Sequence, residues 1–210
     1  MTPFTQHRGV ALPLLRDNID TDAIIPSREM RTVSRSGLAA GLFAPWRYLD
    51  PDARTLNPDF VLNQSAYSGA SILLAGDNFG CGSSREHAVW ALMESCFRAI
   101  ISPSFATIFR NNALRSGLLT VALPQHELDQ LVEWVSADPA AHTIQLDLDT
   151  CSIEFDPERD KKIFSVDPTA RDMLLKGLDE IGLTEQSLDE ITAFEKRDQA
   201  RRPWVYLPSD

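Results

Sequence analysis

The chain has 210 residues, of which 43% are hydrophobic and 24% are charged, and its formal net charge is −10. This length and composition suffice for one sizeable core, whereas the negative charge repels nucleic acids and anionic lipid surfaces. No apolar run approaches the length that spans a bilayer, and the first residues show no cleavage-site pattern. We therefore expect a cytoplasmic globular protein that binds neither nucleic acid nor membrane.

Arginine is concentrated in the first half of the chain. Residues 1–115 contain eleven Arg, no Lys and ten Asp or Glu, whereas residues 116–210 contain nine basic and twenty acidic residues. A guanidinium group matches the two oxygens of a carboxylate and stays charged at any working pH. An arginine-rich coding bias explains the same composition, so the pattern favours an anion site in the first half without establishing one.

The predicted elements begin with a strand over residues 8–15, where apolar and polar residues alternate loosely. Turn-forming residues at 17–22 then predict a polar loop at the end of this strand, followed by apolar residues. Residues 70–75 form a short apolar run that predicts a second strand. A glycine-rich turn leads from it to a predicted helix over 84–98, whose apolar residues keep helical spacing. Between these units, residues 36–69 are rich in Pro, Tyr and Trp and are expected to form long ordered loops.

A second unit of the same kind follows. It consists of a predicted strand over 99–101, a helix over 104–115 with Gly117 as its C-cap, and a strand over 118–123. The alternation of strands and helices predicts an α/β fold.

The last third of the chain is predicted to be more helical. We expect a helix over 127–136, a β-hairpin over 143–155, and two helices within 168–196 that are separated at Gly182. Because no repeat or long linker is evident, residues 1–210 are predicted to form a single domain, in which about 165–210 is a helical C-terminal extension.

The glycine-rich turn is the most informative stretch for function. Gly76, Gly80 and Gly82 allow the backbone to approach a ligand closely where the predicted helix begins. The first helical turn presents unpaired N–H groups and a partial positive charge, which together bind anions. The G-x-G spacing alone also suggests dinucleotide binding, but the third glycine of that motif is missing, and Arg85 stands at the start of the helix instead.

Two explanations remain open for the polar residues of this turn. Ser83 and Glu86 have the S-x-x-E spacing of a capping box, which needs no ligand. Arg85, however, is a cation in the first turn, where it opposes the helix dipole by ~0.3–1 kcal/mol, and a bound carboxylate would explain it. A serine beside that guanidinium gains acidity, so its alkoxide could remove a proton next to a carboxylate.

The three cysteines Cys81, Cys96 and Cys151 are widely spaced. Their odd number and spacing fit neither a disulfide framework nor a CxxC metal site, so we expect them to be reduced. Cys81 is best explained as a small, partly buried residue.

The glycine-rich turn resembles the G-x-G-S-S-R-E-H-A loop of the aconitase family, which residues 80–88 match in full. Further segments resemble the family in order and spacing, from Arg8 to about Leu183, and include DNIDTDAIIP at 17–26, WRYLD at 46–50, NPDF at 57–60, SFATIFRNNALRSGLL at 104–119 and GLDEIGL at 177–183. Within the family, the similarity is greatest to the two-chain enzymes that isomerise isopropylmalate in leucine biosynthesis.

The resemblance implies an aconitase-type swivel domain with β/β/α layers, which closes over a [4Fe–4S] cluster held by a separate large subunit. This chain would then bind no metal or cofactor. In the family's pattern Ser83 is the catalytic base, Arg85 and Ser84 hold a substrate carboxylate, and Thr21 and Asp22 line the facing loop. The reaction implied is that of a hydro-lyase, which isomerises a small hydroxy-dicarboxylate by dehydration and rehydration, with iron acting on the leaving hydroxyl.

The same pattern gives other residues of the turn a structural role. Gly80 and Gly82 would shape the loop together with Glu86, and His87 is expected to fix it through a hydrogen bond rather than to act as a second base.

Substrate choice depends on a departure from the isopropylmalate pattern at residues 26–32. Arg31 stands there in place of the uncharged residue expected, and Arg35 is a second candidate for the same substrate-binding position. In the family an arginine in this loop reads an additional carboxylate; an exposed or salt-bridged arginine is the alternative. The competing functions are therefore a related small subunit that serves another hydroxy-dicarboxylate or tricarboxylate, and an anion-binding module without chemistry.

Overall fold

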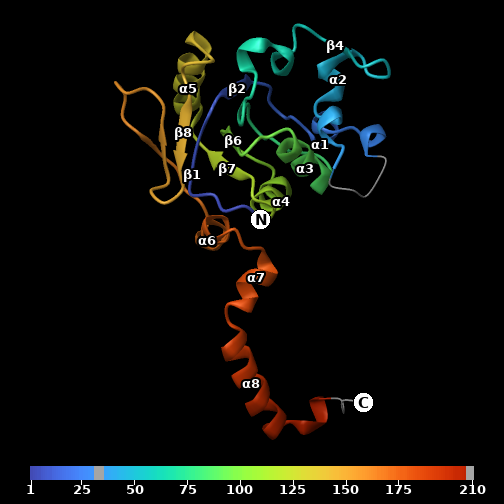
Figure 1. The fold of residues 1–210 in the computed structure, drawn as a ribbon, viewed down its shortest axis with the longest axis vertical. Helices are drawn as coiled ribbons and strands as arrows, with labels where there is room; N and C mark the ends of the chain where they lie inside the picture. Colours follow the sequence, from blue (N-terminus) through green and yellow to red (C-terminus); the bar gives the residue numbers. More distant parts are fainter. Residues whose placement is uncertain (31–35, 207–210) are drawn as a thin grey trace.

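In the part of the chain that the computed structural model describes, residues 1–30 and 36–206, the strands form three sheets (Figure 1). The central sheet is parallel, with the order β2 (Ala11–Leu14), β5 (Ile72–Ala75), β6 (Ala99–Ser102), β7 (Leu119–Ala122). The second sheet is antiparallel, with the order β1 (Gln6–Gly9), β8 (Ile144–Asp147), β9 (Ser152–Glu154), β10 (Lys162–Ile163). The third pairs β3 (Tyr48–Asp50) with β4 (Thr55–Leu56).

The central strands are apolar on both faces because both faces are covered. In β5, Leu73 and Ala75 belong to one hydrophobic core, and Ile72 and Leu74 belong to another. Successive side chains of a strand point to opposite faces, so a strand buried on both sides reads as a continuous apolar run. This explains why the run at 70–75 predicted a strand without alternation.

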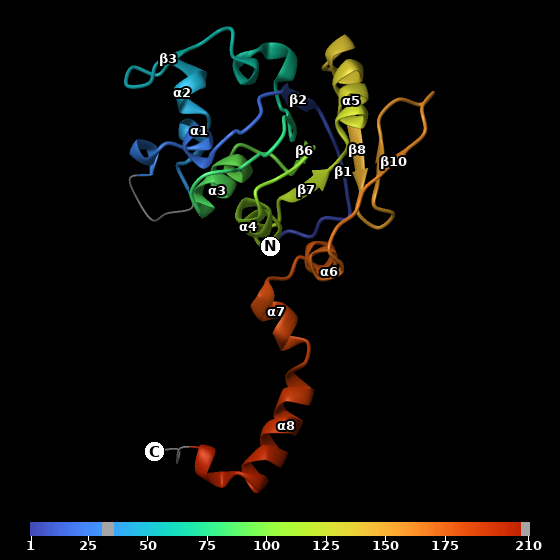
Figure 2. The ribbon, with the colours of Figure 1, turned by 180° about the vertical axis from the view of Figure 1, so that it is seen from behind.

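Two different layers cover the two faces of the central sheet, as Figures 1 and 2 show. The first core is closed by helices α1 (Thr21–Ile24), α2 (Ala44–Arg47), α3 (Glu86–Glu94) and α4 (Thr107–Ser116). The second lies against α5 (Gln125–Ala137) and the antiparallel sheet. The prediction of an α/β fold with β/β/α layers is confirmed.

The first predicted strand is two strands. β1 pairs with β8 in the antiparallel sheet, whereas β2 pairs with β5 in the parallel sheet, so the chain passes from one sheet to the other at Val10. Pro13 fits β2 because β2 is an edge strand, where a missing N–H breaks no ladder. The polar loop predicted over 17–22 ends in α1, which Asp20 caps.

Residues 36–69 contain more regular structure than the long loops predicted. Short 3₁₀ helices precede and follow α2 and the β3–β4 pair, namely η2 (Ala39–Gly41), η3 (Val61–Asn63) and η4 (Ser65–Tyr67); a further one, η1 (Ser27–Glu29), lies upstream of this segment. The Asn63 amide donates to the carbonyls of Arg47 (2.7 Å) and Asn57 (2.8 Å), and the Tyr48 hydroxyl donates to Ala40 O (2.9 Å). Side-chain donors thus bind backbone carbonyls of neighbouring short elements and connect these elements to one another.

The C-terminal part forms three helices and a 3₁₀ turn rather than two helices: α6 (Pro168–Lys176), α7 (Glu180–Glu185), α8 (Leu188–Arg201) and η5 (Pro203–Val205). The separation predicted at Gly182 was wrong. Gly177, with φ +69°, ends α6, and Gly182 lies inside α7, where its N–H donates to the N-cap Asp179 (2.8 Å). Both ribbon views show α7 and α8 extending away from the sheets (Figures 1 and 2).

The hairpin predicted over 143–155 is present as β8 and β9, and the helix predicted over 127–136 is α5. None of the helices in the described part of the chain combines the length and apolar character needed to cross a membrane.

Candidate functional site

The candidate site lies where the loops after β2, β5 and β6 meet at the carboxyl end of the parallel sheet. Asn18 N donates to Asp77 O (2.8 Å), and Asn78 Nδ2 donates to Asn18 Oδ1 (2.8 Å). Ser104 Oγ, after β6, donates to Asp77 Oδ1 (2.6 Å). These bonds join three loops that are far apart in sequence at the edge where parallel α/β sheets bind ligands.

Glycines shape the loop that follows β5. Gly80 has φ +78°, its N–H donates to Ile19 O (2.7 Å), and a Cβ at this position would lie 2.2 Å from the Phe109 ring. Both the left-handed backbone and the contact with Phe109 therefore require glycine here. Gly82 also has a left-handed backbone, with φ +88°. The predicted loop-shaping role of these two glycines agrees with this geometry.

Thr21 connects the first loop to the glycine loop. Its N–H donates to Cys81 O (2.9 Å), and its hydroxyl donates to Ser83 O (3.1 Å). The side chain is buried, and α1, which begins at Thr21, is capped by Asp20 through the Ala23 N–H (2.7 Å). Thr21 thus holds the backbone at Ser83 in place.

Arg85 and Asp22 form an ion pair across the two loops. The Arg85 side chain is 20% exposed and that of Asp22 is 55% exposed. Asp22 thereby offsets the unfavourable position of a cation at the start of α3, and it fixes the direction of the guanidinium group. The structure thus brings together Thr21, Asp22, Ser83 and Arg85, as the resemblance implied.

The capping box between Ser83 and Glu86 does not form. Helix α3 begins at Glu86, its N-cap residue is Arg85 in extended conformation (φ −121°, ψ 108°), and among the described residues Arg85 gives the first turn no side-chain hydrogen bond. Ser83 and Ser84 lie before the helix and are exposed. The helix starts two residues later than predicted, so Ser83 is too far upstream to cap it.

Glu86 and His87 occupy the first turn of α3. A carboxylate there is favourable for the helix dipole. The His87 ring contacts the Trp90 ring, with 4.8 Å between centroids, and makes no hydrogen bond with any described residue. A hydrogen bond from His87 that fixes the loop stays a prediction. Arg31 and Arg35 lie outside the described residues.

Sequence reasoning missed the polar residues that lock the loops together. Ser102, buried at the end of β6, donates to Gly76 O (2.7 Å), and Asp17 accepts the Asp77 N–H (2.8 Å). These residues could have been predicted from the sequence, because a polar residue stands at or shortly after the end of each apolar strand run. Such positions lie at the carboxyl edge of a parallel sheet.

Glu94 was also missed, although it fixes residues 37–39, which follow the predicted substrate-binding candidates Arg31 and Arg35 in the sequence. Its carboxylate accepts the backbone N–H groups of Gly37, Leu38 and Ala39. These hydrogen bonds, that from Gly37 above all, lower the pKa of Glu94 below its ordinary value of 4.5.

The cysteines lie on separate elements. Cys81 follows β5 at the carboxyl edge of the parallel sheet, Cys96 stands between α3 and the amino end of β6, and Cys151 lies in the β8–β9 turn. All three are free thiols, and the described residues contain no group of His, Cys, Asp or Glu side chains placed to hold a metal ion. The thiols of this chain therefore do not fit an iron–sulfur cluster, which needs converging thiolates.

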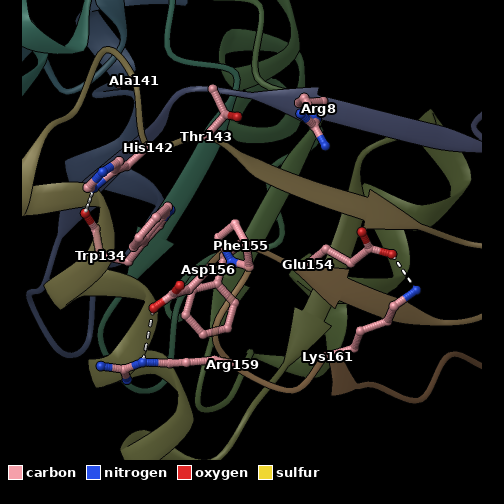
Figure 3. Close-up of a pocket in the computed structure, with 11 residues that line it drawn as sticks. Arg8, Trp134, Ala141, His142, Thr143, Glu154, Phe155, Asp156, Arg159 and Lys161 are labelled. Atoms are coloured by element: carbon pink, nitrogen blue, oxygen red, sulfur yellow. Dashed lines mark hydrogen bonds and ion pairs between the residues drawn. The ribbon is translucent and has the colours of Figure 1, made fainter.

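A separate cavity of about 510 Å³ lies against α5 and the antiparallel sheet (Figure 3). Lys161 pairs with Glu154, and Arg159 pairs with Asp156 (3.3 Å). Trp134 stacks on His142 with 3.7 Å between ring centroids. Its position away from the three loops, and the pairing of these charges, separate this cavity from the candidate site.

Comparison with known proteins gives two family matches and several close relatives. Residues 1–126 match the family described as the aconitase C-terminal domain, and residues 180–206 match the family described as the C-terminal domain of the 3-isopropylmalate dehydratase small subunit.

Among relatives, the chain is 55% identical to the 3-isopropylmalate dehydratase small subunit of Cupriavidus necator over 207 residues, which cover 99% of each chain. It is 48% identical to the same subunit of Methylibium petroleiphilum, over 98% of this chain and 97% of the other. A crystal structure of 3-isopropylmalate dehydratase from Methanocaldococcus jannaschii superimposes with a TM-score of 0.65 at 28% identity, over 90% of this chain and 99% of that one.

Proposed function

The chain belongs to the family of 3-isopropylmalate dehydratase small subunits, which shares its main domain with aconitase, and on that premise we propose how its residues act. It is the small subunit of a two-chain hydro-lyase that interconverts 2-isopropylmalate and 3-isopropylmalate in leucine biosynthesis, by removing water and adding it back at the neighbouring carbon. The observation that carries this function is the meeting of Ser83 with the Arg85–Asp22 pair at the carboxyl edge of the parallel sheet.

Ser83 acts as the base that removes the substrate proton. A serine alkoxide is strongly basic, and a positive charge close to it, such as the guanidinium group of Arg85 two residues further on, would stabilise its negative charge. Thr21 supports this role by binding the Ser83 carbonyl, which limits the directions that the side chain can take. Ser83 is exposed in the single chain, and a partner that covers it would exclude water and strengthen these electrostatic effects.

Arg85 and Ser84 hold a substrate carboxylate. The Arg85–Asp22 contact involves the Arg85 Nη1 atom, and no other described residue accepts a hydrogen bond from this guanidinium group, so its other N–H groups can bind the substrate. Asp22 then orients Arg85, and together with Thr21 it lines the facing side of the site. Arg31 and Arg35 are further candidates for substrate contact.

The complete enzyme needs a large subunit that carries the [4Fe–4S] cluster. The small-subunit names of the relatives and the scattered cysteines of this chain support this proposal. We also propose that residues 1–210 form one swivel-type domain, with about 165–210 as its helical extension. The two cores on either face of one central sheet support this proposal.

The test compares Ser83→Ala with Ser84→Ala in the assembled enzyme. We expect Ser83→Ala to lower kcat by about 10²–10⁴-fold, the usual contribution of general base catalysis, while the melting temperature and the affinity for the large subunit stay unchanged because Ser83 does not cap α3. Ser84→Ala should mainly raise KM. If Ser83→Ala retained most of its turnover, the base assignment would be wrong.

A further inference from the structure

The C-terminal arm, which we define as residues 179–206, leaves large apolar side chains exposed. Ile181 is 69% exposed, Leu188 59%, Phe194 54% and Trp204 78%, and no residue of α7, α8 or η5 is buried. Figures 1 and 2 both show α8 projecting from the body of the chain. A group of exposed apolar side chains on one segment indicates a surface that another molecule covers.

The arm also gains little support from the rest of the chain. Helix α8 has 14 residues, and helices of this length are marginal in water without tertiary packing. Its visible support is local: Arg202 pairs with Asp198 (2.7 Å), whose carboxylate also accepts the Tyr206 hydroxyl (3.0 Å). A helix that is stabilised mainly by its own residues can gain the missing tertiary packing from a partner molecule.

A groove connects the base of the arm to the candidate site. This arm groove is a cavity of about 770 Å³ lined by Trp90 and Met93 of α3, Arg115 of α4 and Ile181 of α7, and it reaches Glu86 in the first turn of α3. The Arg115–Glu180 ion pair (2.8 Å) joins α4 to the start of α7. A molecule that covers the arm and the arm groove is therefore brought to the helix that follows Ser83.

The family matches indicate which molecule this is. Residues 1–126 match a domain named as the C-terminal domain of aconitase, whereas residues 180–206, nearly the whole arm, match a domain named for the 3-isopropylmalate dehydratase small subunit. A domain that is covalently linked to its partner stays close to it without further contacts. A separate subunit has no such link, so it needs additional binding energy to stay associated. The arm is the segment whose match is named for a separate small subunit, so it is the part of the chain suited to supply this binding energy.

We propose that the C-terminal arm and the arm groove are the docking surface for the cluster-bearing large subunit, an inference that rests on the proposed function. Binding through the arm, beside the catalytic loop rather than through it, keeps the two chains associated while Ser83 and Arg85 approach and leave the substrate. Trp204, Phe194 and Leu188 are the anchoring side chains, since large side chains that become fully buried dominate interface energies.

The test uses the full-length triple variant Leu188→Ala/Phe194→Ala/Trp204→Ala and titrates it with the purified large subunit. Alanine preserves helical propensity, so circular dichroism should show unchanged helix content. We expect the dissociation constant to rise at least about 100-fold. The amount of large subunit needed for half-maximal activity should rise equally, with kcat at saturation unchanged. Ile163→Ala is the matched control, because Ile163 is 68% exposed but lies on β10.

Two results would overturn the inference. One is an unchanged dissociation constant for the triple variant; the other is a loss of self-association of this chain without any change in binding to the large subunit, which would assign the arm to a second copy. The proposed function fails by a different measurement: Ser83→Ala would then keep its turnover, independently of how the arm variants bind the large subunit.

Discussion

Arg85 occupies a position that is unfavourable for the helix but useful for the proposed function. It stands at the N-cap of α3, where a cation is disfavoured, and it is paired with Asp22. The pair is partly exposed, so its contribution to folding is small. What the pair provides is direction, because a guanidinium group held on one side presents its remaining N–H groups to a ligand on the other.

This leads to a prediction for the pair in the assembled enzyme. Arg85→Lys keeps the charge but loses the planar fork, and we expect kcat/KM to fall by about 10–100-fold, the loss typical of a hydrogen bond between charged groups. Asp22→Asn should have a smaller effect in the same direction. The double variant should lose less than the product of the two single effects, since both changes act on the same guanidinium group.

Steady-state kinetics on the four proteins of this double-mutant cycle measure the coupling. Strictly multiplicative effects would show that Asp22 does not orient Arg85. An Arg85→Lys enzyme with unchanged KM and kcat would remove Arg85 from the substrate site altogether.

At the level of elements, the sequence predicted most strands and helices but fewer of their ends. Gly117 was correctly identified as the C-cap of α4, with φ +94°. Gly177 has the same role in α6 and was missed, because a helical pattern with two glycines does not show which one takes the left-handed conformation. Two contacts favour Gly177 as the end of α6. Asp179 caps the next helix, α7, and Met1 and Pro3 from the other end of the chain pack against Gly177.

The start of α3 shows the same limit at the candidate site. The spacing of Ser83 and Glu86 predicted a cap, but Thr21 binds the carbonyls of Cys81 and Ser83, and the backbone is still extended at Arg85, so the helix begins only at Glu86. The Thr21–Ser83 contact joins residues 62 positions apart in sequence. The meeting of Thr21 and Asp22 with Ser83 and Arg85 could be inferred from the family resemblance, but not from local pattern.

Glu94 gives a test at this scale, since its carboxylate connects α3 to residues 37–39 by hydrogen bonds. Glu94→Gln removes the charge from three hydrogen bonds. We expect destabilisation of about 0.5–1 kcal/mol at pH 7, in the lower part of the range for hydrogen bonds because the side chain is exposed. For a chain of this size that corresponds to a melting temperature about 1–4 °C lower.

The pH dependence of this difference has a definite sign. The folded pKa of Glu94 is lowered, so its stabilising contribution is fully present above its unfolded pKa near 4.5 and is lost as the pH falls through the folded value. The gap between wild type and Glu94→Gln should therefore be constant around neutral pH and should close below pH 4.5. Glu158→Gln is the control, because the Glu158 carboxylate makes no hydrogen bond or ion pair with any described residue; a gap that widened on acidification would contradict this role of Glu94.

At the scale of the whole molecule, the chain has two regions with different charge and different proposed tasks. The first half, which contains the loops of the candidate site, is nearly neutral and contains all its positive charge as arginine, whereas the second half is strongly acidic. The loops that the structure joins at the carboxyl edge of the parallel sheet belong to this first half, and the anion site there stays a prediction. The arm, by contrast, could be recognised as helical from its sequence, but its extension away from the sheets emerged only from the structure.

The distribution of cysteines over the whole molecule determines what this chain can do without a partner. A [4Fe–4S] cluster needs several thiolates around one centre, but Cys81 and Cys96 belong to opposite ends of the parallel sheet, and Cys151 belongs to the antiparallel sheet. Bringing these thiols together would require the central strands to separate, with loss of both cores. We therefore predict that the purified chain, mixed with iron and sulfide under anaerobic conditions, develops neither a stable iron–sulfur absorbance nor dehydratase activity.

Addition of the large subunit should restore turnover of isopropylmalate, as followed by the absorbance of the dehydrated intermediate. The Cys81→Ala variant should support the same turnover as wild type. A stable chromophore with turnover in the isolated chain would show that this chain is a complete enzyme, and dependence of that chromophore on Cys81 would identify its ligand.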